Sequence, residues 1–260
     1  MYDNPLYLHL PFISTMNLIL DFGNTRIKIA VFFGDEILYQ ENLDQINNSL
    51  LEKLFRRYPE IQNSILSSGV SQSKEINNLL SDLSDTFLLL NHKTNLPIKN
   101  TYKSPESLGY DRIANVVGAS TEFPENNTLV IDVGTAITYD FINYLGEFLG
   151  GNISPGANMR AISLHNYTSK LPLVKLHNNP LLLSKTTEDA LNSGILNGIL
   201  FEIEAYIKEL KDIYSDLKVI LTGGDINLFD KKLKKTIFVD SNLNLKGLNR
   251  ILNYNAKKTN

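Results

Sequence analysis

Two short stretches of this sequence place a carboxylate, a glycine and hydroxyl side chains directly after an apolar run. They are LILDFGNT at residues 18–25 and LVIDVGTAIT at residues 129–138. The glycine of such a turn lets backbone amides approach an anion closely. A carboxylate cannot touch a phosphate directly, so it would act through a cation and its waters. Each stretch taken alone could also be a plain hairpin turn whose aspartate caps loop amides.

The occurrence of the same pattern in both halves favours phosphate binding over turn chemistry. Both copies continue into a second apolar stretch and reach a glycine turn at similar distances, at Gly34 and Gly146. Such repetition indicates a duplicated domain that closes on one nucleotide. In the first copy Asn24 and Thr25 would add hydrogen-bond donors, and Arg26 or Lys28 would add positive charge. In the second copy Asp132 would hold a cation and Thr135 the nucleotide phosphates.

A third stretch, YKSPESLGYDR at residues 102–112, is the candidate for the phosphate acceptor. A hydroxyl that attacks a γ-phosphate needs a carboxylate to accept its proton and orient it, and Asp111 is suited to that role. The neighbouring Arg112 could bind a carboxylate of the acceptor in bidentate fashion. The alternative is an exposed Asp–Arg pair at a helix start.

Other nucleotide motifs are not supported. The stretch 151–156 has the glycine spacing of a P-loop, but Ala157 stands where the lysine is required. No G-x-G-x-x-G follows an expected strand, so a dinucleotide site has no support. The stretch TGGD at 222–225 could let adenine or ribose lie against bare backbone, or could simply begin a helix.

Composition narrows the function classes. The chain has 260 residues, 43% of them hydrophobic and 20% charged, which is ordinary for a globular protein. A net charge of −3 gives no overall positive field for nucleic acid. The absence of cysteine excludes disulfides and thiol catalysis, and it fits a cytoplasmic location. No apolar run approaches the roughly 18 residues of a membrane helix, so we expect no membrane partner.

Hydrophobic periodicity predicts an α/β protein made of mixed sheets with flanking helices. We expect strands at 16–21, 27–33, 36–41, 64–67, 85–90, 128–133, 136–142, 147–153, 218–221 and 237–240. We expect helices at 50–55, 71–83, 187–214 and 245–252, a helix capped by Ser107 or Asp111, and a helix that starts at Pro155. Residues 94–105 and 171–185 read as loops.

The domains are expected to be a disordered leader at 1–15, a first domain at 16–122, a second at 123–254 and a frayed tail at 255–260. Gly194 and Gly198 lie inside the longest helix, where each costs roughly 1 kcal/mol relative to alanine. We therefore expect that helix to pack closely against another helix, in the other domain or in a second subunit.

Several motifs in order make the chain resemble type III pantothenate kinases, members of the acetate kinase/sugar kinase/Hsp70/actin superfamily. The resemblance covers residues 16–252, nearly the whole chain. It rests on DFGNTRIK (21–28), SPESLGYDRIAN (104–115), VIDVGTAITYD (130–140), GGNISPGANMRAISL (150–164), LP (171–172), TEDALNSG (187–194) and LTGGD (221–225).

The resemblance implies two duplicated actin/ribonuclease-H-like domains and ATP-dependent phosphorylation of pantothenate on its primary hydroxyl, the first step of coenzyme A synthesis. It implies Asp111 as general base, a monovalent cation (potassium or ammonium) at Asp132, magnesium with ATP, and a homodimer. For ATP it implies the loop Asp21, Phe22, Gly23, Asn24, Thr25, Arg26, Ile27 and Lys28, together with Thr135. For pantothenate it implies Tyr102, Gly109, Tyr110, Asp111 and Arg112, with Thr187 reaching across the dimer interface.

Two other functions remain as alternatives. One is a catalytically weak, nucleotide-binding transcriptional accessory protein of the same fold, which would be expected to lose Asp111 or Asp132; this chain keeps both. The other is a kinase of the same superfamily for sugars or acetate, which does not account for GYDR together with TEDALNSG.

Overall fold

The computed structural model describes residues 15–23, 25–69, 74–229 and 237–256. By its internal contacts the chain forms two compact units, the first ending at Leu90 and the second beginning at Asn91. Predictions for the leader up to residue 14, for Asn24, for 71–73 and for the tail beyond residue 256 lie outside the described residues.

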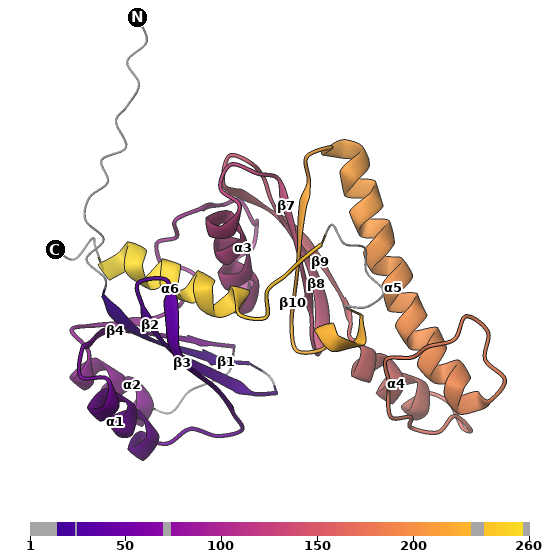
Figure 1. The fold of residues 1–260 in the computed structure, drawn as a ribbon, viewed down its shortest axis with the longest axis horizontal. Helices are drawn as coiled ribbons and strands as arrows, with labels where there is room; N and C mark the ends of the chain where they lie inside the picture. Colours follow the sequence, from indigo (N-terminus) through magenta and orange to yellow (C-terminus); the bar gives the residue numbers. More distant parts are fainter. Residues whose placement is uncertain (1–14, 24, 70–73, 230–236, 257–260) are drawn as a thin grey trace, which may run out of the picture. The chain divides into compact units, whose positions relative to one another are not determined.

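The first unit is a five-stranded sheet covered by two helices (Figure 1). Its strand order is β3-β2-β1-β4-β5, in which β1, β2 and β3 are antiparallel neighbours and β4 and β5 run parallel to β1. Apolar side chains from both helices pack with those of the first three strands in one core. The bounds are β1 Met16–Phe22, β2 Ile27–Phe33, β3 Glu36–Leu43, α1 Asn48–Arg57, β4 Ile61–Ser68, α2 Lys74–Leu83 and β5 Thr86–Leu89.

The second unit repeats this topology with one strand added. Its order is β11-β10-β7-β8-β9-β6, with an antiparallel β7-β8-β9 meander and with β10 and β11 parallel to β7. The strands are β6 Lys99–Asn100, β7 Thr128–Val133, β8 Ala136–Ile142, β9 Glu147–Pro155, β10 Lys218–Thr222 and β11 Phe238–Val239. The helices are α3 Tyr110–Glu122, α4 Ala157–Asn166, α5 Thr187–Ile213 and α6 Leu243–Ala256, with short 3-10 turns at Pro105–Ser107 and Ile226–Leu228.

The expected duplication is confirmed, because β1 to β5 correspond in order and direction to β7 to β11. The matching hairpins turn at Gly34 and Gly146, whose φ angles of 60° and 72° favour glycine. Asp21 and Asp132 then occupy equivalent places near the ends of the first strands.

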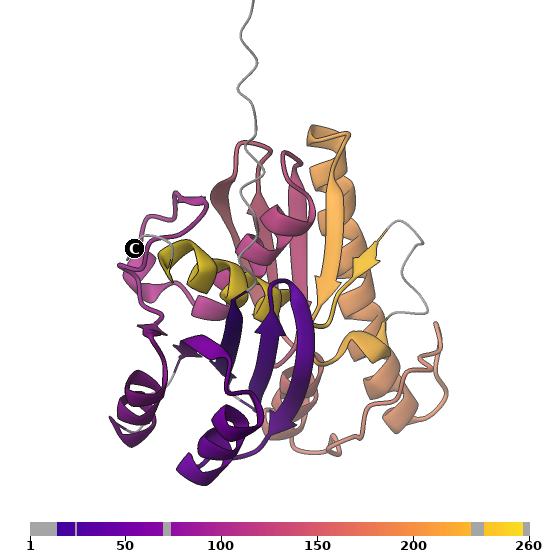
Figure 2. The same ribbon diagram turned by 60° about the vertical axis from the view of Figure 1, so that its left-hand side comes forward.

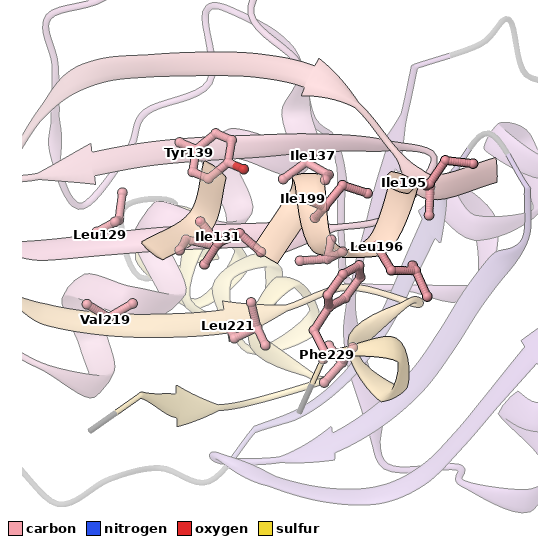
Figure 3. Packing of buried hydrophobic residues seen from close by; sticks show 14 of the residues in the cluster. Leu129, Ile131, Ile137, Tyr139, Ile195, Leu196, Ile199, Val219, Leu221 and Phe229 are labelled. Atoms are coloured by element: carbon pink, nitrogen blue, oxygen red, sulfur yellow. The ribbon is translucent and has the colours of Figure 1, made fainter. Parts of the chain in front are cut away.

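The two faces of the second sheet differ in chemistry. Alternate residues of β7, β8 and β10 point toward α4 and α5 and form an apolar core, as Figure 3 shows. The opposite face, under α3, carries Asp132, Thr138 and Asp140. Two residues of α3 bond these carboxylates: Asn115 donates to Asp132, and Arg112 donates to Asp140.

Two glycines allow α6 to cross close to α3, beside which it lies in Figure 2. A Cβ on Gly247 would lie 1.8 Å from the Ala114 carbonyl oxygen, and one on Gly118 would lie 2.5 Å from that of Leu243. Since these neighbours are backbone atoms, the crossing needs glycine at both positions. The crossing fixes α3, the helix that carries the candidate base.

The structure corrects four local expectations. Residues 91–122 belong by contacts to the second unit, because β6 pairs with β9 and α3 packs on α6, so the units do not divide at 122–123. The loop expected at 94–105 contains that short strand. The N-cap of α3 is Gly109, without a side-chain cap bond, so neither Ser107 nor Asp111 caps it. Pro155 ends β9, and α4 follows the N-cap Gly156.

The glycines of α5 have open surroundings among the described residues of the second unit. A Cβ on Gly194 would meet no atom within 4 Å, and one on Gly198 would meet only the Arg160 guanidinium, at 3.8 Å. Among the described residues of the second unit, these two positions therefore do not mark a close helix crossing of the kind made by Gly118 and Gly247.

Candidate active site

In the first turn, the flanking residues are buried and the described turn residues between them are exposed. Phe22 and Ile27 are buried in the core of the first unit, so only their backbone groups are available to a phosphate. Gly23, Thr25 and Arg26 are exposed, and the Gly23 amide closes the turn by donating to the Arg26 carbonyl at 3.1 Å.

The carboxylate of the first turn is nearly buried and pairs in register with a lysine. Asp21 is 8% exposed, and Lys28 lies opposite it on β2 and is half-buried. This strand end therefore combines a carboxylate, an ammonium group and exposed turn amides. That is the donor set a magnesium nucleotide requires.

In the second turn, the carboxylate of Asp132 is bonded by a side chain of α3 and lies beside two glycines. Asn115 of α3 donates from Nδ2 to Asp132 Oδ2 at 2.7 Å. The other oxygen, Oδ1, lies 3.7 Å from the position of a Cβ on Gly134 and 2.6 Å from that of a Cβ on Gly223. Gly223 has a φ of 110°, so glycine is required there both for its backbone angle and for room beside the carboxylate.

Thr135 lies at the exposed tip of the same turn. Its carbonyl accepts from the amide of Gly156, the residue before α4, at 3.1 Å. A Cβ on Gly156 would lie 2.1 Å from the Gly134 carbonyl oxygen, so the turn and the start of α4 are in direct backbone contact. Thr135 therefore belongs to a turn that is packed directly against the start of α4.

The candidate base lies in the first turn of α3. Asp111 is exposed, and its Oδ1 accepts from the backbone amide of Arg112 at 2.8 Å. The preceding Gly109 leaves room for the carboxylate, since a Cβ there would lie 2.4 Å from Asp111 Oδ1. Asp111 and Asn115 are four residues apart, so both project from one face of the helix. Tyr110, between Gly109 and Asp111, is half-buried.

Arg112, the candidate for the acceptor's carboxylate, is buried beside an aspartate that the sequence did not single out. Its Nε and Nη2 donate to Asp140 Oδ1 at 2.9 and 2.6 Å, and the two side chains are 5% and 0% exposed. A Cβ on Gly151 would lie 2.6 Å from Asp140 Oδ1, so glycine makes room for this carboxylate. Two of the five guanidinium N–H groups are used in this pair.

In the Arg112–Asp140 pair, burial and the partner's charge shift the pKa of each group in opposite directions. Burial alone lowers the pKa of Arg112, but the hydrogen bonds and charge of Asp140 raise it above its ordinary value. Burial raises the pKa of the Asp140 carboxyl, which Arg112 holds down in part. Arg112 therefore remains charged at neutral pH.

An aromatic pair covers the guanidinium. The rings of Tyr102 and Phe148 stack with 6.0 Å between centroids and an interplanar angle of 5°. The Arg112 guanidinium carbon lies 5.3 Å from the centroid of Tyr102 and 5.9 Å from that of Phe148. The structure thus brings the predicted residues Tyr102 and Arg112 together, and cation–π attraction adds to their packing.

Thr187, predicted from the resemblance, is exposed as the first residue of α5. The N-cap is the preceding Thr186, whose Oγ1 accepts from the Asp189 amide at 3.1 Å. α5 covers the face of the sheet opposite α3 (Figure 1). Within one chain, the helix with Thr187 and the helix with Asp111 are therefore separated by the sheet.

Two residues of this region were missed from sequence. Asn115 bonds Asp132, and Asp140 bonds Arg112. Asp140 had a detectable signal, because a charged residue stands in the otherwise apolar alternation of β8. Asn115 had only its spacing of four residues from Asp111.

The candidate cation ligands of this region are the carboxylate oxygens of Asp132. Among the described residues, no group of three or more His, Cys, Asp or Glu side chains is arranged to hold a metal ion. Asp132 offers carboxylate oxygens beside a turn, and carboxylate oxygens are ligands that hard cations prefer. The helices of the described residues also include none long and apolar enough to cross a membrane.

Comparison with solved structures supports the fold. A Campylobacter jejuni protein described as a Baf family transcriptional activator aligns with a TM-score of 0.59 and 23% identity, over 92% of this chain and 99% of its own. The activator of the 2-hydroxyisocaproyl-CoA dehydratase from Clostridium difficile, solved with bound ADPNP, aligns with a TM-score of 0.54 and 13% identity, over 94% of this chain and 97% of its own. At these identities the likeness concerns the fold alone.

Sequence comparison identifies the family. The type III pantothenate kinase of Bacteroides fragilis is 46% identical over 242 residues, which cover 92% of this chain and 98% of that protein. The one from Phocaeicola vulgatus is 44% identical over 244 residues, covering 93% of this chain and all of that protein. The family model for type III pantothenate kinase matches residues 17–209. The chain therefore belongs to the type III pantothenate kinase family.

Proposed function

We propose that this protein transfers the γ-phosphoryl group of ATP to the primary hydroxyl of pantothenate, the first step of coenzyme A synthesis. The observation that carries the proposal is family membership together with the presence of Asp111 near the start of α3 and of Asp132 near the end of β7. Asp111 is exposed at the start of α3, and Asp132 lies at the end of β7, joined to that same helix by Asn115.

In the proposed reaction the Asp111 carboxylate accepts the proton of the pantothenate hydroxyl as that oxygen attacks the γ-phosphorus. The bond from the γ-phosphorus to the bridging oxygen breaks, and ADP leaves with the electron pair. Asp111 is suited to this role because its carboxylate is exposed and is oriented by the hydrogen bond from the Arg112 amide.

ATP would be held by the turn 21–28 and by Thr135. When bound with ATP, magnesium would neutralise charge on the phosphates, and Asp21 would hold it through water. A monovalent cation, potassium or ammonium, would bind at Asp132. The near burial of Asp21 and the hydrogen bond from Asn115 to Asp132 support such indirect contacts.

Pantothenate would be contacted by Tyr102, Gly109, Tyr110 and Arg112. Arg112 remains our candidate for the pantothenate carboxylate, with three guanidinium N–H groups beyond the two that bond Asp140. Because the Asp140 pair and the aromatic stack restrain it, the guanidinium would lose little entropy on binding.

We also propose a homodimer, in which Thr187 of one subunit reaches the pantothenate of the other. Large apolar side chains are exposed along β9, α4 and the loop after it, where a partner would cover them. They are Leu149, Ile153, Met159, Ile162, Tyr167, Leu173, Leu181, Leu182 and Leu183. The empty space over Gly194 would admit a helix of the partner. We also propose the cytoplasm as the location, because the reaction would consume ATP.

Replacing Asp111 with asparagine tests the proposed base. Asp111→Asn should lower kcat for pantothenate phosphorylation by about 100-fold to 10,000-fold, because the amide cannot take the hydroxyl proton. The fold should be unchanged, since the side chain is exposed. Product formation is followed by mass spectrometry. The matched control is Glu122→Gln, the same charge change at the exposed far end of α3, which should turn over normally. Wild-type turnover by Asp111→Asn would remove Asp111 from the role.

A further inference from the structure

Asn115 connects the helix of the candidate base with the candidate cation ligand. Its side chain is on α3, one turn after Asp111, and its Nδ2 donates to Asp132 Oδ2 at 2.7 Å. A carboxylate only accepts, so the amide must turn its nitrogen toward Asp132. The orientation of Asn115 is therefore set by the carboxylate.

This orientation leaves the other end of the amide unsatisfied. Asn115 is 1% exposed, and its Oδ1 has no hydrogen-bond partner in the described part of the chain. A buried polar atom left in this state destabilises the folded protein. An apolar side chain of similar shape would avoid the cost, so Asn115 is not explained by stability.

The surroundings of Asn115 favour a positive charge. Asp111, Asp132 and Asp140 carry three carboxylates on this side of the sheet against the one guanidinium of Arg112. Asp140 Oδ2 is also buried, and within the described residues it has no neighbour that meets the geometry of a hydrogen bond. An excess of negative charge and unsatisfied oxygens lowers the cost of placing a cation here.

We propose that Asn115 is a positioning residue for the monovalent cation site, holding the Asp132 carboxylate in the orientation that binds the cation. The inference rests on the proposed cation role of Asp132. By linking Asp132 to α3, Asn115 also keeps the cation carboxylate in register with Asp111. Asn115 acts through Asp132 and needs no contact with substrate.

The variant Asn115→Leu separates positioning from stability. Leucine keeps the branched shape but removes both the bond to Asp132 and the unsatisfied oxygen. We expect a melting temperature at or above that of the wild type. We expect the potassium concentration for half-maximal effect to rise about 10-fold or more, as when a residue that orients a metal ligand is lost.

The control is Asn244→Leu on α6. Asn244 is also nearly buried, at 4% exposure, and its Oδ1 is also unsatisfied within the described residues. The same exchange there should give a similar change in melting temperature and leave the potassium response at the wild-type level.

Two readouts are used on the full-length protein. The first is the rise in melting temperature on adding potassium chloride, against choline chloride of equal ionic strength, with magnesium and a non-hydrolysable ATP analogue present. The second is the potassium dependence of kcat, with KM for pantothenate measured separately and expected to stay nearly constant.

The proposal is overturned if Asn115→Leu keeps the wild-type potassium response, if Asn244→Leu loses it equally, or if the wild type shows no potassium response in either readout. Failure of the proposed function is distinguishable. A wild-type protein that is stabilised by potassium but forms no phosphorylated pantothenate would refute the kinase reaction and leave the role of Asn115 standing.

Discussion

The charged pair of Arg112 and Asp140 is almost completely removed from water, at 5% and 0% side-chain exposure. Such a pair adds little to stability relative to apolar residues, because desolvation offsets the attraction. Asp140 also restricts the rotation of the Arg112 side chain, and this restriction would help a binding site more than it helps stability. When one partner is removed, the other charge stays buried without compensation, and the protein is destabilised.

Asp140→Asn should destabilise the protein by about 3–5 kcal/mol, because the Arg112 charge would be left buried without its partner. Urea unfolding at neutral pH measures the loss. The control is Glu147→Gln, which breaks the exposed ion pair between Lys99 and Glu147, and whose unfolding midpoint should hardly move. Equal losses in both variants would show that burial of the Arg112 pair has no special energetic effect.

At the residue scale, sequence reasoning finds groups whose chemistry is local to a turn. Asp111 and Asp132 stand beside glycines and hydroxyls, and that context is visible along the chain. The partners Asn115 and Asp140 are joined to Asp132 and Arg112 across 17 and 28 residues. Their pairing depends on how α3 lies over the sheet, which no spacing in the sequence encodes.

The turn after β10 approaches the second candidate turn more closely than any side chain would permit. A Cβ on Gly223 would lie 2.2 Å from the Val133 carbonyl oxygen, whereas one on Gly224 would meet nothing within 4 Å. The Asp225 amide also donates to the Val133 carbonyl at 2.9 Å, which draws the two turns together.

These neighbouring glycines form a matched pair for a stability test. Gly223→Ala should lower the free energy of unfolding by more than about 1 kcal/mol, because the new methyl group meets backbone at a left-handed φ angle. Gly224→Ala should change it little. Chemical denaturation compares the two variants. If both lose the same stability, close approach of the turns is not what requires Gly223.

At the element scale, strands were predictable where apolar periodicity was long. β1, β7 and β10 are buried along almost their whole lengths and were expected within a few residues. β6 was missed because it has two residues, both polar, and pairs only through its backbone. The start of α4 was misplaced because Pro155 suits the first turn of a helix as well as the end of an edge strand.

At the scale of the molecule, the repeated strand order shows one architecture used twice, and in each copy an aspartate is the last residue but one of the first strand. The duplication was predictable because both copies keep the carboxylate, the turn glycine and the hairpin glycine. The division between units was not, because residues 91–122 join the second unit through contacts with β9 and α6 that lie far along the chain.

The most direct test of the whole account is ADP release by the wild-type protein with ATP, magnesium and pantothenate, in potassium chloride and then in sodium chloride. The account predicts pantothenate-dependent turnover that is substantially faster in potassium. Folded protein that releases no ADP in either salt would contradict the kinase reaction. Equal turnover in both salts would support the kinase and contradict the cation role of Asp132.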